Sequence, residues 1–332
     1  MIRSLTSVRV HKRSTIREEG ASLRERKSGV PTVGHTSVML KEVVLMLNLM
    51  EGDVVVDGTL GLGGHSEAIL KAAPVTLLGI DADEASATFA RERLSKLGER
   101  AKNATVVVGN FGDIVRLTHE QHHKSVNKVL LDLGWNMGQL QSGRGFSFLA
   151  DEPLNMSYGQ KPASGFNAAE ILNLWEEKTI ADVLFGYGEE RYARRIAKAV
   201  VARRKLAPIE TTLEFVEIIR DSVPAAYRHG KIHPATRSFQ ALRIAVNDEL
   251  GVLERCLEES FKLLSCRGRI VVITFHSIED RIVKRMFATW VKEKHGTLIH
   301  KKPLTPTTEE ITHNRPSRSA KLRGIEKICN EK

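Results

Sequence analysis

The chain has 332 residues, of which 42% are hydrophobic, enough for one large or two ordinary globular domains. No apolar run reaches the roughly 18 residues of a transmembrane helix, so we expect no membrane span. The net charge of +10 and the pI near 9.5 indicate a polyanionic partner. Cys256, Cys266 and Cys329 show neither pairing nor metal-ligand spacing, which fits a reducing compartment and argues against zinc.

The amino-terminal segment is basic. Residues 1–28 carry six Arg and two Lys against three Glu, and no acidic residue precedes Glu18. This composition is typical of an organellar transit peptide, which would place the protein in the mitochondrial matrix. A basic tail that touches RNA or nothing explains it equally well, and the protein would then be cytoplasmic. Glycines and Pro31 between residues 29 and 34 predict a linker, so we expect 1–34 to be a flexible segment.

A glycine-rich turn follows the first expected strand. The β-branched run 53–57 predicts a buried parallel strand that ends on Asp57. Four glycines follow within seven residues, and a helical segment begins at Ser66. Glycines let a turn pass close beneath a ligand, and the start of a helix offers free backbone N–H groups. The pattern predicts a small-molecule site at the end of this strand.

Two cofactors would suit such a turn. A dinucleotide site needs G-x-G-x-x-G, but Ser66 stands where the third glycine belongs. S-adenosylmethionine needs no pyrophosphate cradle, and Asp57 suits its cationic amino-acid end. Asp81, twenty residues after Gly61, suits a ribose because a carboxylate accepts two hydroxyl hydrogen bonds. We therefore expect S-adenosylmethionine and no metal; the alternative is that Asp57 caps a turn and the glycines only pack a helix on a strand.

Strand and helix patterns alternate, which predicts a doubly wound parallel α/β sheet with its site at the carboxyl ends of the strands. The further expected strands are 75–81, 105–108, 128–132 and 269–274, with edge strands at 298–302 and 319–327. The expected helices are 39–49, 66–71, 84–97, 168–174, 179–185, 189–204, 212–222 and 234–250.

The fourth expected strand ends on Asp132, close to Trp135 and Asn136. The lone pair of an exocyclic base amine is delocalised, so acceptors for its two hydrogens are needed to hold it facing a methyl group. We expect Asp132 to be such an acceptor, Trp135 to stack on the target base and Asn136 to contact its polar edge. The alternative is that Asp132 binds cofactor only and Trp135 belongs to the core.

Long motifs follow one another from residue 35 to the end. They are HTSVMLKE at 35–42, DGTLGLGGHS at 57–66, GRGFSF at 143–148, YGEER at 187–191, HPATRSFQALRI at 233–244, FHSIEDRIVK at 275–284 and RSAKLR at 318–323. Through them the chain resembles the small-subunit rRNA (cytosine-N(4))-methyltransferases, the MraW/RsmH family with its mitochondrial relatives. The resemblance implies a class I, Rossmann-like, S-adenosylmethionine-dependent methyltransferase with an inserted helical domain. Its substrate would be small-subunit rRNA or the immature small ribosomal subunit.

The resemblance also implies a division into domains and a set of donor contacts. The methyltransferase domain would comprise 35–155 and 236–332, and the substrate-recognition insertion 156–235. The implied cofactor contacts are Gly63, Gly64, His65, Asp81, Phe111, Asp132 and Gln139.

Two stretches depart from the family pattern. Residues 135–138 are Trp-Asn-Met-Gly where Val-Ser-Ser-Pro is usual, and 155–158 are Asn-Met-Ser-Tyr where Asp-Met-Arg-Met is usual. They keep a second function open, an RNA-binding ribosome-assembly factor with weakened catalysis. A dehydrogenase is a distant third because of Ser66.

Basic residues lie on one side of the expected helix 189–204, away from its apolar stripe. Such faces are usually only solvated, but the net charge and the resemblance favour phosphate contact. Polar residues on helix 234–250 either bind RNA or brace the domain junction. The expected RNA contacts are Arg191, Arg194, Arg195, Lys198, Arg237 and Arg243. The sequence leaves open whether the chain forms a homodimer.

Overall fold

The computed structural model describes residues 37–134, 137–140 and 142–329. The expectations for 1–34, Trp135 and Asn136 therefore lie outside the described residues. Within the described part, seven strands form one sheet in the order β3-β2-β1-β4-β5-β7-β6. The strands are β1 Val54–Asp57, β2 Thr76–Asp81, β3 Ala104–Val108, β4 Val126–Asp132, β5 Leu264–Thr274, β6 Gly296–Leu298 and β7 Lys321–Lys327.

The first five strands are parallel, and β7 runs antiparallel to both of its neighbours. The strands β1, β2 and β4 are almost continuous apolar runs because both faces of the sheet are covered. The order reverses between β1 and β4, so the carboxyl ends of these two strands flank the switch point where such sheets bind ligands.

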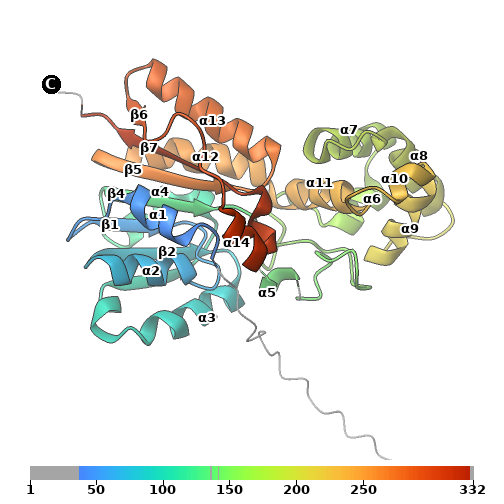
Figure 1. Ribbon diagram of the computed structural model, residues 1–332. Helices are drawn as coiled ribbons and strands as arrows, with labels where there is room; N and C mark the ends of the chain where they lie inside the picture. The colour runs from blue at the N-terminus through green and yellow to red at the C-terminus, as the bar shows by residue number, and fades with distance from the viewer. Residues whose placement is uncertain (1–36, 135–136, 141, 330–332) are drawn as a thin grey trace, which may run out of the picture. The chain divides into compact units, whose positions relative to one another are not determined.

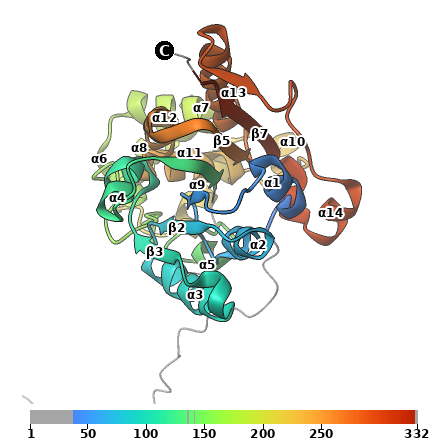
Figure 2. The ribbon, with the colours of Figure 1, turned by 90° about the vertical axis from the view of Figure 1, so that its left-hand side faces the viewer.

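Helices cover both faces of the sheet, as the alternating pattern predicts (Figure 2). One face packs on α1 Leu40–Leu47, α2 Gly64–Ala72 and α3 Glu84–Ser95. The other packs on α4 Ile114–Glu120, α12 Glu249–Leu263 and α13 Ser277–Lys292. Shorter elements are η1 Gly98–Ala101, η2 Phe111–Asp113, α14 Thr308–His313 and η3 Arg315–Ser319. None of the described helices has the length and apolar character to cross a bilayer.

The segment between β4 and β5 contributes a helical layer with its own core (Figure 1). After α5 Met137–Leu140 come α6 Ala168–Leu174, α7 Glu177–Gly188, α8 Ala193–Arg204, α9 Thr212–Ser222, α10 Ala225–Arg228 and α11 Thr236–Asn247. Buried residues from Phe146 to Val246 form this core, so α11 packs with the insertion. The domain boundaries inferred from the resemblance remain predictions.

Several expected boundaries are wrong, including the start of β5, at Leu264 rather than 269, and the end of α7, at Gly188 rather than 185. Helix α8 begins at Ala193 rather than 189, because Glu189 adopts a left-handed conformation with φ 50° that ends α7. Helix α11 ends at Asn247 because Asp248 has φ 46°. Strand β6 ends at Leu298, where an edge strand was expected to begin. Neither left-handed residue is a glycine, so the usual sequence signal for a helix end is absent.

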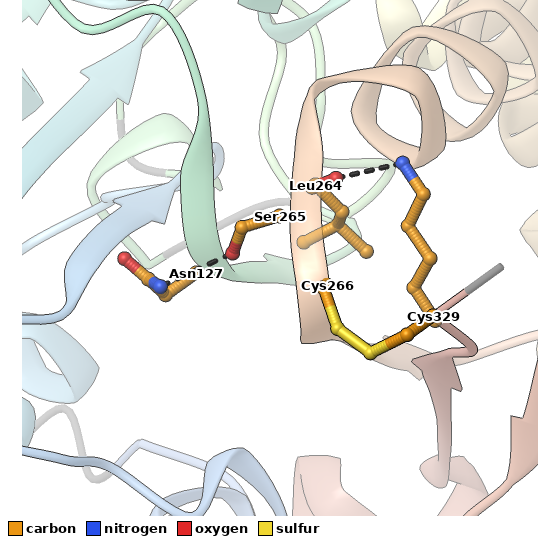
Figure 3. Close-up of a disulfide and its surroundings, with 6 residues drawn as sticks. Asn127, Leu264, Ser265, Cys266 and Cys329 are labelled. Carbon is orange, nitrogen blue, oxygen red and sulfur yellow. Dashed lines mark hydrogen bonds between the residues drawn. A yellow bond between two sulfur atoms is a disulfide. The ribbon is translucent and has the colours of Figure 1, made fainter. Parts of the chain in front are cut away.

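The expectation of unpaired cysteines is also wrong, because Cys266 and Cys329 form a disulfide (Figure 3). The antiparallel register of β5 and β7 pairs Arg269 with Glu326. Cys266 lies three residues before Arg269 and Cys329 three residues after Glu326, so the same register sets the two cysteines opposite each other. Their Cα atoms are 5.0 Å apart. Sequence spacing could not show this, because the two residues are 63 positions apart and meet only through the sheet. Cys256 is buried and free, and burial raises the pKa of its thiol to about 12.

Gly188 lets α7 approach α11 closely. A Cβ at this position would lie 2.4 Å from the Arg237 carbonyl oxygen, whereas one at Gly186 would meet nothing within 4 Å. The Gly188→Ala substitution should therefore lower the free energy of unfolding by about 1–3 kcal/mol through overpacking. The matched Gly186→Ala should raise it by up to about 1 kcal/mol, because alanine favours a helix. Urea unfolding checks both, and equal effects would contradict this packing.

Candidate active site

The turn after β1 is built on a left-handed glycine and a buried acid. Gly63 has φ 78° just before α2, and a Cβ there would press on Ala90 at 3.2 Å. Asp81, at the end of β2, accepts the backbone N–H of Gly61 at 2.7 Å and that of Asp83 at 2.8 Å. Burial raises the pKa of Asp81 to about 6. Each carboxylate oxygen keeps a lone pair beyond these bonds, so Asp81 can still accept ribose hydroxyls.

Asp57 holds the turn rather than facing a ligand. It is fully buried and accepts hydrogen bonds from the Ser66 hydroxyl at 2.7 Å and the Thr59 amide at 3.3 Å. Burial raises its pKa to about 6, against the lowering effect of the Ser66 bond. The expectation that Asp57 meets the cationic end of the donor is therefore wrong, and the alternative, an acid that caps the turn, is what the structure has. Ser66 is the partner that Asp57 requires.

His65 and Asp132 lie together beside the turn. The His65 Nε2 is 3.0 Å from the Val38 carbonyl oxygen, so this nitrogen carries a hydrogen. The His65 Nδ1 lies 3.5 Å from Asp132 Oδ2. Thr59 accepts the Asp132 backbone N–H, which ties the end of β4 to the turn. His65 and Asp132, which belong to different parts of the sequence, are thus neighbours at the switch point of the sheet.

Asp132 is the least satisfied carboxylate of this region. Its Oδ1 is buried and has no hydrogen-bond partner in the described part of the chain. Burial raises its pKa well above the ordinary value, and the nearby charges of Asp57 and Glu279 raise it further. Buried polar atoms are nearly always paired, so an oxygen of this kind is a ready acceptor for a bound molecule.

The other two implied donor contacts are near this edge of the sheet. Phe111 opens η2 directly after β3 and is half-buried, and a Cβ on Gly58 of the glycine turn would lie 3.4 Å from its Cβ. Gln139 is buried in the short helix α5, which follows β4. Both therefore sit in connections that leave the carboxyl ends of strands.

The end of β5 adds a polar cluster to which sequence analysis assigned no role. Glu279, buried in the first turn of α13, accepts the Phe275 backbone N–H at 2.9 Å, and its Oε1 lies 3.0 Å from His276 Nε2. Burial works against its charge, but the His276 contact keeps the pKa of Glu279 below its ordinary value. Arg243 makes two hydrogen bonds to Glu249, at 2.7 and 2.8 Å.

Glu249, His276 and Glu279 could together hold a metal ion by distance alone. However, Glu249 is bound by Arg243 and also accepts the Tyr158 hydroxyl at 3.1 Å. A cation would have to compete with that guanidinium, so this group gives a metal no favourable place. The expectation of no metal remains a prediction.

Arg144, in the GRGFSF motif, connects the loop after α5 to the segment that follows β2. It donates to the Tyr158 carbonyl oxygen at 2.7 Å and to Asp83 at 3.2 Å. Asn247 holds the same loop by accepting the Tyr158 amide at 2.9 Å and donating to the Met156 carbonyl oxygen at 2.8 Å. Sequence reasoning missed Arg144, whose only signal was membership of the GRGFSF motif, whereas Asn247 belongs to the polar residues of helix 234–250 that were expected to bind RNA or brace the domain junction.

Most of the expected RNA contacts lie on one exposed face of the insertion. Arg191, Arg194, Arg195 and Lys198 are exposed at the start of and along α8, and Arg237 is half-buried on α11. Arg243 is different, because its ion pair with Glu249 commits its guanidinium inside the protein. This contact favours the interpretation that the polar residues of α11 brace the domain junction rather than bind RNA.

The fold and site together define a class of protein. A doubly wound sheet with an antiparallel β7, a glycine turn after β1 and an acid at the end of β2 are the features of a class I S-adenosylmethionine-dependent methyltransferase. The model of the MraW methylase family matches residues 32–328. The chain belongs to this family.

Three bacterial relatives are each named ribosomal RNA small subunit methyltransferase H. The protein of Sulfurihydrogenibium sp. is 44% identical over 88% of this chain and 98% of its own length. That of Treponema denticola is 44% identical over 89% and 97%, and that of Hyphomonas neptunium is 41% identical over 91% of both chains.

The Ser66→Ala substitution tests the role of Asp57. It removes the hydroxyl that a buried carboxylate needs, so the free energy of unfolding near pH 8 should fall by about 1–3 kcal/mol. The Ser66 bond lowers the pKa of Asp57, so the cost is present above about pH 6 and shrinks as Asp57 protonates below it. Urea unfolding at both pH values measures this. A loss that is the same at about pH 5 would contradict it, and Ser95→Ala, at an exposed hydroxyl, is the control.

Proposed function

We propose that the protein transfers a methyl group from S-adenosylmethionine to the exocyclic N(4) amine of a cytosine in small-subunit rRNA. The observation that carries this proposal is the relation, over nearly the whole chain, to proteins named as small-subunit rRNA methyltransferases. The position of Asp132 supports it from the side of chemistry, because this acid ends β4 beside the glycine turn.

The residues present suit the donor. Asp81 would hold the ribose hydroxyls, and the turn at Gly63 and Gly64 would pass beneath the amino-acid end. Phe111 and Gln139 would line the adenine side, with His65 and Asp132 near the sulfonium. When bound, S-adenosylmethionine supplies an electrophilic methyl group on a cationic sulfur. A cation suits this place because burial raises the pKa values of Asp81 and Asp132, so both carboxylates gain from a positive charge beside them.

Asp132 would orient the nucleophile. Its unpartnered Oδ1 can accept one hydrogen of the cytosine amine, which directs the nitrogen lone pair toward the methyl group. The nitrogen would take the methyl group in place of one hydrogen, which would leave to solvent as a proton because the ring makes the methylated amine acidic. No strong base is needed for that loss. Trp135 stacking on the base and Asn136 contacting its edge remain part of the proposal.

The exposed basic face of α8 would hold the RNA backbone. A surface pocket of about 330 Å³ lies between α7 and α8 and is lined by Phe185, Arg191, Tyr192, Arg194 and Arg195 among others. Phe185 is 67% exposed, which is costly for an aromatic ring unless a partner covers it. Guanidinium groups beside an open aromatic ring suit a phosphate and an unstacked base.

A ribosome-assembly factor with weakened catalysis is the second candidate. The observation that favours it lies at residues 155–158, where the family usually has an acid and an arginine. Ser157 is instead buried, and its hydroxyl donates to the Gly159 carbonyl oxygen at 2.9 Å. This side chain therefore serves the loop rather than a substrate.

The place of action follows from the relatives. Those named above are bacterial, which favours a cytoplasmic protein and gives no support to the transit-peptide interpretation of residues 1–28. The relatives do not decide whether the chain forms a homodimer, which the sequence also leaves open.

Methyl transfer to RNA separates the two candidates. The protein, labelled S-adenosylmethionine and either deproteinised small-subunit RNA or immature subunits are incubated together, and digested nucleosides are analysed by mass. We expect label in N(4)-methylcytidine, and fragment mapping then identifies the base. Tight RNA binding without transfer to either substrate would favour the assembly factor.

Donor affinity should fall in acid. The pKa of Asp81 is raised to about 6, so the free carboxyl gains a proton below that pH and loses its capacity to accept ribose hydroxyls. We expect the affinity for S-adenosylmethionine to fall about tenfold from this group by about pH 5. The free energy of unfolding of the ligand-free protein should change in the opposite direction and rise in acid. Ionising an acid whose pKa is raised in the folded state costs stability as the pH rises.

Calorimetric titration from about pH 8 to about pH 5 measures this dependence. The Asp81→Asn variant should bind weakly throughout and with a shallower dependence on pH. A constant affinity of the wild-type protein over this range would count against Asp81 as the ribose acceptor.

The salt dependence of RNA binding tests the basic face. Two lost phosphate contacts in Arg194→Ala plus Lys198→Ala should reduce the slope of log affinity against log salt by roughly one to two. Lys96→Ala plus Lys124→Ala, exposed cations of the same total charge outside the helices between β4 and β5, are the control. Equal slopes for the two double variants would refute a specific role for α8.

A further inference from the structure

Two buried polar atoms near the end of β4 have no hydrogen-bond partner in the described residues: Asp132 Oδ1 and His276 Nε2. They lie at the ends of neighbouring parallel strands, since Asp132 pairs in register with Ile273 of β5 and His276 follows three residues later, as the N-cap of α13. The chain leaves β4 beside the same segment, because a Cβ on Gly134 would lie 3.6 Å from the Phe275 ring. Both atoms therefore lie at one edge of the sheet.

His276 presents a donor from its far ring nitrogen. Its side chain caps α13 by accepting the Glu279 backbone N–H at Nδ1, with a distance of 3.4 Å. In the neutral ring Nδ1 is thus the acceptor, and Nε2 carries the hydrogen. The Glu279 Oε1 lies 3.0 Å from Nε2, at an angle outside that of a hydrogen bond, and this contact lowers the pKa of Glu279. The carboxylate therefore favours a hydrogen on Nε2, and a bound acceptor at a better angle can share that hydrogen.

Asp132 Oδ1, in contrast, is an acceptor. One acceptor and one donor at this edge of the sheet, neither with a hydrogen bond of its own, would complement the cytosine edge. Cytosine carries an amine donor at N(4) and, next to it, a ring acceptor at N3. Uracil reverses both positions, with an acceptor at O4 and a donor at N3, so the same pair of protein groups would repel it.

We propose that His276 reads the target base by donating its Nε2–H to cytosine N3 while Asp132 Oδ1 accepts from the N(4) amine. This inference rests on the proposed function and names a specificity-determining residue for it. A purely structural role would use Nδ1 for the cap of α13 and Nε2 only for the contact with Glu279, and neither contact would depend on the target base. A metal ligand would require the neighbouring Glu249 to leave Arg243.

The test separates the cap from the donor. Asn and Ser are good N-cap residues, and their side chains end short of the Nε2 position. His276→Asn and His276→Ser therefore keep the cap of α13 and lose the hydrogen-bond donor at Nε2. Ser277→Ala, at the next residue, is the control. Each protein is assayed with an RNA fragment that carries, at the mapped position, either cytidine or 3-deazacytidine, which lacks the N3 acceptor. Melting temperature and donor affinity are measured beside kcat/KM.

We expect wild-type protein and Ser277→Ala to prefer cytidine to 3-deazacytidine by roughly tenfold more than either His276 variant does. The analogue and the His276 variants each remove the same buried hydrogen bond, so the analogue costs nothing more once His276 is replaced. The intrinsic reactivity of the analogue cancels in this ratio. The same ratio for all folded proteins would overturn the role of His276 while leaving the proposed function intact. Wild-type protein that methylates neither RNA would overturn the proposed function, and this inference with it.

Discussion

Buried negative charge at the carboxyl edge of the sheet is the constraint on which this structure depends. Asp57, Asp81, Asp132 and Glu279 come from four segments and converge on one place. Backbone amides and the Ser66 hydroxyl satisfy two of them, and the capping box of α13 satisfies Glu279. Asp132 has the least compensation, so the site is prepared for a ligand that brings positive charge and hydrogen-bond donors. A sulfonium donor and an amine acceptor supply both.

The YGEER motif explains how the insertion is joined to that edge. Gly188 brings α7 against α11, and Glu189 ends α7 in a left-handed conformation. Glu189 then accepts the Ser277 hydroxyl at 2.9 Å and pairs with Arg281 at 3.0 Å, both in the first turns of α13. His276 caps α13, and Glu279 lies in its first turn. The helices that carry the basic face therefore connect directly to the residues beside Asp132.

Much of the fold could be predicted from local patterns. Helices α6 and α9 have the expected bounds because each begins with a capping box, at Asn167 and Thr211. The doubly wound sheet and the turn at Gly63 also follow from local pattern. What could not be predicted depends on tertiary contact: the left-handed Glu189, the cysteines joined across β5 and β7, the burial of Asp57 against Ser66, and the hydrogen bond from Arg144 to Asp83. No short-range signal marks any of these.

Single-turnover methyl transfer by Asp132→Asn, with saturating donor and RNA, tests the central claim most directly. Asparagine keeps the size of the side chain but replaces one acceptor with a donor, which would turn the amine away from the methyl group. We predict that the rate of transfer falls by about a hundredfold, beyond any change in donor affinity measured separately. Transfer at the wild-type rate would contradict the account, because the carboxylate at the end of β4 would then have no part in presenting the amine.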